Sequence, residues 1–189
     1  PARTLRWFKR AQPQVVVMAA ARVGGIQYNI NQPVDLLHDN LMIQSNIMRA
    51  AHETGAERLV FLGSSCIYPK DAPQPLKEES LLHGPPEPTN GAYAMAKLAG
   101  LSLAQSYRMQ YDCDFISLIP CNLYGANDKF DALNAHMLPA LLMKAHAAKL
   151  CGQKELSVWG SGTPRRECLY SDDLADAVEF ALKNYHSAK

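Results

Sequence analysis

The chain has 189 residues, of which 48% are hydrophobic, and its 19 basic and 18 acidic residues leave a net charge of +1. This balance, without a polybasic run, argues against nucleic-acid or membrane-surface binding, and no apolar stretch is long enough to span a bilayer. Five scattered cysteines without a C-x-x-C pair favour reduced thiols in the cytoplasm. We therefore expect a globular domain, or part of one, without a signal peptide.

The first predicted elements are a helix over residues 1–12 and a short buried strand over Val15–Met18. Three small residues follow the strand, and they would let a planar ligand approach the backbone. They are Ala19, Ala20 and Ala21. Close packing of a helix on the strand explains them equally well.

Two long helices are predicted, over Val34–Thr54 and Ala92–Met109. Each carries apolar residues on more than one side, so each must be covered twice. One side would face the sheet, and the other would face either a second subunit or the chain itself. We expect a homodimer through these helices.

The stretch from Arg58 to Lys97 carries the chemistry. An apolar run, Leu59–Leu62, predicts a buried parallel strand that ends at Gly63 and is followed by Ser64, Ser65 and Cys66. Ligands of open α/β sheets lie at such strand ends.

Tyr93 and Lys97 are four residues apart on the second helix, which places them on one face. The ammonium is expected to lower the pKa of the phenol, and a serine hydroxyl to bond both the phenol and a substrate oxygen. The alternatives are a solvated helix face for this pair and a small buried hydrophobe for Cys66.

Further elements follow a proline-rich loop over residues 68–90. They are a strand at Phe115–Ile119, a turn at Pro120–Gly125, a helix opened by His136 and running to about Leu150, a short strand at Leu156–Trp159, and a last helix capped by Ser171 with Asp172 and Asp173 in its first turn. No metal site is expected.

Five runs carry a resemblance that spans almost the whole chain: MAAARVGGI, FLGSSCIYP, EPTNGAYAMAK, CNLYGANDKFD and VWGSGTPRRE. They are similar to the extended short-chain dehydrogenases/reductases, and within them to the enzymes that convert GDP-4-keto-6-deoxy-D-mannose to GDP-L-fucose. The resemblance implies an α/β fold with a doubly wound parallel Rossmann-type sheet. It also implies 3,5-epimerisation followed by NADPH-dependent 4-reduction of a GDP-sugar.

The resemblance also implies roles for individual residues. Cys66 and His136 match the epimerisation pair, while Ser64, Tyr93 and Lys97 match the reduction set. NADP(H) would contact Ala19, Ala20, Ala21, Tyr93, Lys97, Pro120, Asn122, Leu123 and His136. The sugar nucleotide would contact Lys144, Trp159 and Arg166.

A G-x-x-G-x-x-G turn, which would hold the pyrophosphate, does not occur in these residues. About forty N-terminal residues are expected to be missing, and the substrate lobe is expected to be cut short. We predict a partial NADP-binding domain over 1–135 and a partial substrate-binding region over 136–189, with weak NADPH binding and little activity alone. The alternatives are another nucleotide-sugar epimerase or dehydratase and a truncated, non-catalytic binding fragment.

Overall fold

A computed structural model describes residues 2–131, 135–158 and 160–185 of the chain. Its helices are α1 (Ala2–Ala11), α2 (Ile26–Asn31), α3 (Pro33–Glu53), α4 (Gly91–Tyr111), α5 (Met137–Leu150) and α6 (Ser171–Asn184). Its strands are β1 (Val15–Met18), β2 (Arg58–Leu62), β3 (Asp114–Leu118), β4 (Asn122–Tyr124) and β5 (Cys168–Tyr170). The described residues also form short 3₁₀ helices, η1 (Ser65–Ile67), η2 (Glu78–Ser80) and η3 (Pro88–Asn90).

The main sheet has the order β1-β2-β3, and both pairings are parallel. Val16 pairs with Leu59, and Leu59 pairs with Phe115, so the three strands end at one edge. The apolar run of β2 therefore forms the buried parallel strand that the sequence predicts, because both faces of the sheet are covered there. The prediction of a buried strand at Val15–Met18 is wrong in its burial, since only Met18 is buried and the side chains of Val15 and Val17 are exposed. A second parallel pair joins β4 to β5.

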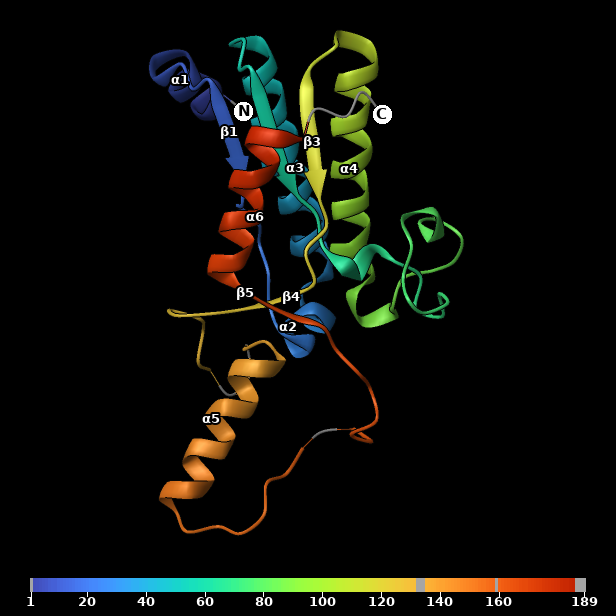
Figure 1. Cartoon of the computed structure of the whole chain (residues 1–189), viewed down its shortest axis with the longest axis vertical. Helices are drawn as coiled ribbons and strands as arrows, with labels where there is room; N and C mark the ends of the chain where they lie inside the picture. The colour runs from blue at the N-terminus through green and yellow to red at the C-terminus, as the bar shows by residue number, and fades with distance from the viewer. Residues whose placement is uncertain (1, 132–134, 159, 186–189) are drawn as a thin grey trace.

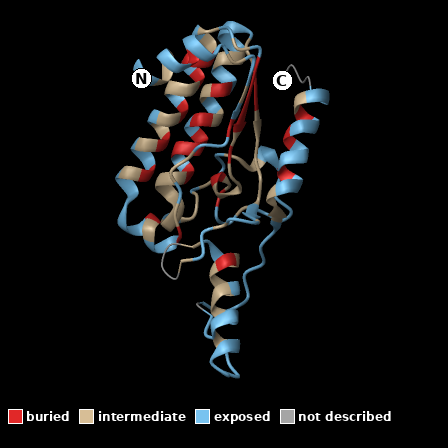
Figure 2. Cartoon of the chain, turned by 90° about the vertical axis from the view of Figure 1, so that its left-hand side faces the viewer, coloured by how far each residue is buried: buried red, intermediate tan, exposed pale blue. Residues whose placement is uncertain are grey.

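Helices cover both faces of the main sheet, with α6 on one face and α3 and α4 on the other (Figures 1 and 2). Leu59 and Phe61 pack with Phe115 against α1, α3 and α4, whereas Val60 packs with Ile116 against α6. This division follows from the alternation of side chains along a strand. The α/β layering expected from the sequence is thus confirmed.

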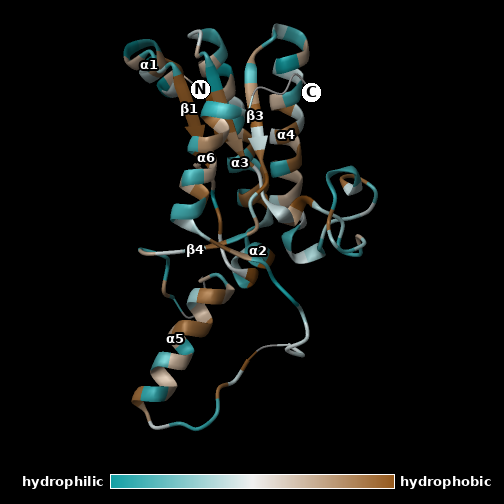
Figure 3. Cartoon of the chain, in the orientation of Figure 1, coloured by the Kyte–Doolittle hydropathy of each residue, from teal (hydrophilic) through white to brown (hydrophobic). Residues whose placement is uncertain are grey.

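Helices α3 and α4 lie against each other as well as against the sheet. Gln44 of α3 is buried and its Nε2 donates a 2.7 Å hydrogen bond to the carbonyl of Ala96 in α4. A side chain at Gly100 would meet the Phe61 ring and lie 2.5 Å from the Gln44 Oε1, so only glycine allows this approach. Both helices carry hydrophobic residues along their length (Figure 3). Some of these side chains remain exposed, including Val34 at 74% and Met95 at 50%.

Arg58 fastens α6 to the sheet from the start of β2. Its guanidinium donates to the Asp114 carboxylate at 2.6 Å, and to the carbonyls of Leu182 at 2.5 Å and Tyr185 at 3.1 Å. These carbonyls end α6 and have no partner within the helix. Arg58 therefore caps the C-terminal end of α6 from the neighbouring sheet. Its side chain is buried in this position, with 7% of the residue exposed.

Three predictions about local structure are wrong. Residues 156–158 form no strand, and no neighbouring strand pairs with them among the described residues. Ser171 is the first residue of α6 and Tyr170 its N-cap, so the serine gives no side-chain cap, although Asp172 and Asp173 do lie in the first turn. The predicted turn after Pro120 contains a strand, β4, because it pairs with β5.

In the part of the chain that the structure describes, no helix is long and apolar enough to cross a membrane. The division of the chain between residues 135 and 136 stays a prediction. Helix α6 comes from the second predicted region and packs on the sheet of the first.

Candidate active site

The predicted site lies where β2 and β3 end side by side. The backbone pairing continues past both strands, since the amide of Gly63 bonds the Leu118 carbonyl at 2.7 Å and the amide of Ser65 bonds the Pro120 carbonyl at 3.1 Å. The hydroxyl- and thiol-bearing segment is thereby fixed at the carboxyl edge of the sheet, where α/β folds bind ligands.

Ser64 and Cys66 are joined by a local cap. Ser64 is the N-cap of the 3₁₀ helix η1 and has extended backbone geometry. Its Oγ accepts a 3.4 Å hydrogen bond from the amide of Cys66. Burial raises the pKa of the Cys66 thiol, and this effect is only partly opposed by Ser64 and by the positive charge of Lys97. The thiol therefore keeps its proton at neutral pH.

Lys97 is the most deeply buried charged residue of the site, with 3% exposure. Its Nζ donates a 2.7 Å hydrogen bond to the Leu62 carbonyl, and lies 5.0 Å from the ring centroid of Phe61 and 5.8 Å from that of Tyr93. Burial lowers the pKa of Lys97, with the Cys66 thiolate acting in the opposite direction. Lys97 therefore anchors α4 to the end of β2.

Tyr93 departs from the expected electrostatics. Burial raises the pKa of its phenol, and the negative charge of a Cys66 thiolate raises it further. The expectation that Lys97 lowers this pKa is wrong, because burial is the main influence on it and the Lys97 ammonium, bonded to the Leu62 carbonyl, is not among the groups that shift it. A phenol that keeps its proton is suited to donating one.

The structure therefore brings four predicted residues together: Ser64, Cys66, Tyr93 and Lys97. Cys66 and Tyr93 hold transferable protons, the Ser64 hydroxyl already accepts a hydrogen bond, and Lys97 is cationic. Such a set can donate protons to a carbonyl oxygen or carbon held at the edge of the sheet.

The structure does not bring the remaining catalytic candidate, His136, into contact with this cluster. It is the N-cap of α5 and its side chain is exposed. Helix α5 extends away from the sheet, with its N-terminal end nearer the main body (Figure 1). His136 is not among the groups that shift the pKa of Cys66 or Tyr93.

The predicted substrate contacts are also peripheral. Lys144 donates from Nζ to the Ser157 carbonyl at 3.5 Å, and exposed Arg166 donates to the Arg165 carbonyl at 2.8 Å. Trp159 lies outside the described residues.

A family model for the NAD dependent epimerase/dehydratase family matches residues 1–189. The chain belongs to the NAD dependent epimerase/dehydratase family. The resemblance expected from its motifs is confirmed, and the family binds a nicotinamide cofactor.

Relatives within this epimerase/dehydratase family are identical to the chain at about half of the aligned positions. It is 52% identical to GDP-L-fucose synthase of Sinorhizobium fredii, over 95% of this chain and 57% of that protein. It is 52% identical to GDP-L-fucose synthase of Escherichia coli, over 90% of this chain and 53% of that protein. The chain thus spans little more than half the length of the curated relatives it matches.

Solved structures of the same type superpose closely. GDP-mannoheptose C4 reductase from Campylobacter jejuni with NADP bound matches 96% of this chain and 59% of its own, with 37% identity and a TM-score of 0.87. A GDP-L-fucose synthetase from Naegleria fowleri bound to NADP matches 97% of this chain and 60% of its own, with 33% identity and a TM-score of 0.85. The Rossmann-type fold class is confirmed.

The predicted cofactor contacts of this epimerase/dehydratase chain occupy two places. Ala19 and Ala20 are exposed and Ala21 is half-buried, directly past β1. Asn122 and Leu123 are exposed on β4, and the Asn122 amide already donates to the Glu167 carbonyl at 3.0 Å. Pro120 is half-buried beside Ser65.

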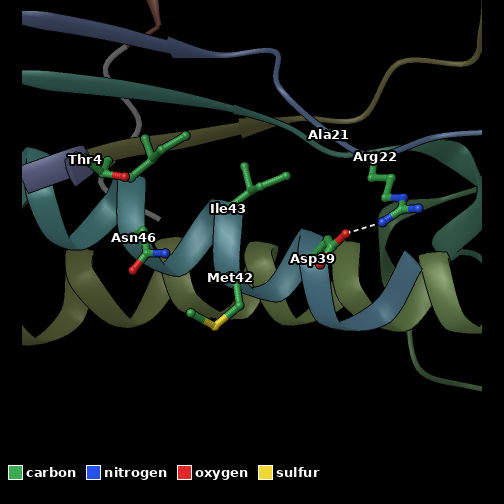
Figure 4. Close-up of a pocket in the computed structure, with 8 residues that line it drawn as sticks. Thr4, Ala21, Arg22, Asp39, Met42, Ile43 and Asn46 are labelled. Atoms are coloured by element: carbon green, nitrogen blue, oxygen red, sulfur yellow. Dashed lines mark hydrogen bonds and ion pairs between the residues drawn. The ribbon is translucent and has the colours of Figure 1, made fainter. Parts of the chain in front are cut away.

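The sequence reasoning missed Arg22, which follows the three alanines. Its Nε donates to the Tyr28 hydroxyl at 2.7 Å, one Nη pairs with Asp35 at 2.9 Å and the other pairs with Asp39. Arg22 and Asp39 border a groove of about 580 Å³ between α1 and α3 (Figure 4). The available signal was the spacing of Asp35 and Asp39, which are four apart on one helix face.

Proposed function

We propose that the chain is the catalytic part of a GDP-L-fucose synthase, an oxidoreductase and epimerase of nucleotide-sugar biosynthesis. It would convert GDP-4-keto-6-deoxy-D-mannose to GDP-L-fucose by 3,5-epimerisation and NADPH-dependent reduction at C4. The observation that carries the proposal is the cluster of Ser64, Cys66, Tyr93 and Lys97 at the carboxyl edge of a parallel sheet. Identities of 52% to proteins of that name support the substrate class.

The residues at this edge fit an NADP(H) molecule. The exposed alanines past β1 leave the backbone open, and Lys97 keeps further donor protons beyond the one bonded to Leu62. The bound cofactor would supply a hydride to C4. The alanines would lie beside the adenosine and pyrophosphate side of the cofactor, whereas Lys97 and the segment after Pro120 would contact its nicotinamide side.

During reduction, Tyr93 would give its proton to the C4 oxygen, and Ser64 would orient that oxygen. Tyr93 suits this role because its raised pKa keeps it protonated at neutral pH. Lys97 joins α4 to the Leu62 carbonyl, so it would position the helix that carries Tyr93. It would also bond the nicotinamide ribose.

During epimerisation, the C4 ketone acidifies the C3 and C5 protons, and each centre needs one group to remove a proton and another to deliver one. A thiol that keeps its proton suits delivery, so Cys66 would be the donor. Removal would then fall to His136, whose exposed imidazole begins α5. Arg166 and Lys144, with Trp159, would hold the GDP diphosphate, because guanidinium and ammonium groups bind phosphate well.

Homodimerisation through α3 and α4 is part of the proposal. Val34, Leu37 and Met42 of α3 and Met95 of α4 remain exposed at 74%, 36%, 38% and 50%. A second copy would cover them. The five free cysteines suit a reducing compartment such as the cytoplasm.

The test is proton NMR of GDP-4-keto-6-deoxy-D-mannose in deuterated water, with the longest natural form of the protein that carries these residues. We expect deuterium at C3 and C5 without NADPH, and GDP-L-fucose when NADPH is added. Reduction without exchange at C3 and C5 would assign the protein to the simple C4 reductases instead.

A further inference from the structure

Two amide side chains tie α2 to the start of α4. The Nδ2 of Asn29, in α2, donates a hydrogen bond to the Oδ1 of Asn90, which directly precedes Gly91. Asn29 is 8% exposed, and its own Oδ1 is buried without a partner among the described residues. A buried acceptor without a donor lowers the stability of the fold. Asn29 therefore makes its bond to Asn90 although its own Oδ1 is destabilising.

Asn90 also gives up its usual role. It is the N-cap of α4, and asparagine caps helices well because its side-chain oxygen accepts from the second or third helical amide. Here those amides belong to Ala92 and Tyr93, yet Asn90 makes no side-chain cap bond: its backbone continues the helical geometry of η3 into α4, and its Oδ1 is bonded to Asn29. Such departures from local preference concentrate at functional sites.

The tie joins two parts of the proposed active site. Helix α2 begins directly after the loop that contains Ala19–Ala21, and Asn90 lies three residues before Tyr93. A groove of about 400 Å³ runs between α2 and the start of α4, and is lined by Asn29, Ile30, Pro33, Pro88, Thr89 and Ala92. Because the groove leaves the two elements partly apart, the amide pair is well placed to set their spacing.

We propose that Asn29 is a positioning residue, which acts through Asn90 to hold the first turn of α4, and with it the Tyr93 phenol, against the Ala19–Ala21 loop. The inference rests on the proposed function, in which Tyr93 donates the proton during reduction. It adds a residue of α2 whose side chain reaches the start of α4 through its bond to Asn90.

Asn29→Leu separates a positioning role from a structural one. Leucine keeps the size but removes both the donor and the unpartnered acceptor, and it releases the Oδ1 of Asn90, which can then turn toward the amides of Ala92 and Tyr93. We expect an unchanged or higher Tm, slower hydrogen exchange at the amides of Ala92 and Tyr93, and a loss in kcat of reduction of about tenfold to a hundredfold with little change in KM. A purely structural role would instead lower Tm and speed that exchange.

A second variant covers the case in which leucine disrupts folding. Asn90→Ser can cap α4 but is too short to reach Asn29, so the same loss of kcat is expected with Tm maintained. Asn90→Asp keeps an acceptor for the Nδ2 of Asn29, so its kcat should stay close to that of the wild type. Asn46→Leu, the same change at a half-buried asparagine of α3, is the matched control and should leave kcat unchanged.

Hydrogen exchange is measured without substrate on the longest natural form of the protein that carries these residues, so it is independent of the reaction. Unchanged exchange at Ala92 and Tyr93 in both Asn29→Leu and Asn90→Ser would overturn the inference, whatever the activity. Wild-type kcat in these two variants would overturn it as well. If the exchange result holds but the wild type neither epimerises nor reduces the GDP-sugar, the proposed function fails and the amide tie remains as a structural finding.

Discussion

Arg58→Met tests whether the cap across the sheet holds α6 in place. Methionine keeps the length of the side chain but removes every donor to the Asp114 carboxylate and to the carbonyls of Ala181, Leu182 and Tyr185. The last turn of α6 then loses these donors, while the carboxylate loses its ion pair with Arg58 and keeps its 3.9 Å contact with Arg108.

The structure sets the size of the effect. Breaking a fully buried ion pair costs about 3–5 kcal/mol, but the Asp114 side chain is 38% exposed and water can solvate it. The carbonyls of α6 each lose a bond to a charged donor, worth about 1.5–3 kcal/mol in a buried setting, and they too regain water as the helix end loosens. We therefore expect the free energy of unfolding to fall by about 3 kcal/mol, which for a chain of this length lowers Tm by roughly 6–12 °C.

The assay is urea unfolding followed by circular dichroism, with hydrogen exchange of the α6 amides to locate the damage. The matched control is Arg49→Met, because Arg49 is a 67% exposed side chain paired with Glu53 one turn away, and such pairs contribute only about 0.3–0.5 kcal/mol. A loss below about 1 kcal/mol for Arg58→Met, with α6 still protected, would refute this account of the cap.

Other predictions follow from the site and the core. Tyr93→Phe removes the phenolic proton and should slow reduction by a hundredfold to ten-thousandfold, roughly, while deuterium exchange at C3 and C5 of the sugar persists; equal loss of exchange would contradict separate proton donors. Cys66→Ser should depress that exchange and leave Tyr93 and Lys97 in place, and wild-type exchange would remove Cys66 from the proton relay. Because burial raises the pKa of Cys66, the rate of its alkylation by iodoacetamide should reach half its maximum at a higher pH than the alkylation rate of a cysteine in a model peptide does. A lower midpoint pH would show that the pKa of Cys66 is lowered instead. Gly100→Ala places a methyl group against the Phe61 ring and should destabilise the fold by about 1–3 kcal/mol in the same urea assay, whereas an unchanged midpoint would mean that the helix can shift.

The sequence predicts those elements whose pattern repeats. The apolar run of β2 and the two-sided apolar helices α3 and α4 are found within one or two residues of their predicted limits. Helix α2 was missed because IQYNIN has no apolar period long enough to recognise. Strands β4 and β5 were missed because each has three residues and exists only through the other. Residues 156–158 illustrate the reverse, since an apolar run without a neighbour remains irregular.

At the site, spacing predicts which side chains meet but not their charge states. The grouping of Ser64, Cys66, Tyr93 and Lys97 follows from a strand end and a helix period. The direction of the Tyr93 pKa does not, because it depends on how deeply α4 is buried and on where the Lys97 ammonium is held. The tie between Asn29 and Asn90 spans 61 positions in sequence, so no local pattern reveals it.

The open side of β1 has a consequence for handling the chain. Within the described residues β1 bonds only to β2, and its Val15 and Val17 side chains are 46% and 45% exposed. Its sequence, VVVM, contains no charge and no proline, which are the features that protect edge strands from pairing with other molecules. In concentrated solution the isolated chain should therefore aggregate by edge-to-edge strand addition, and Val17→Lys should act as a gatekeeper that keeps it dispersed.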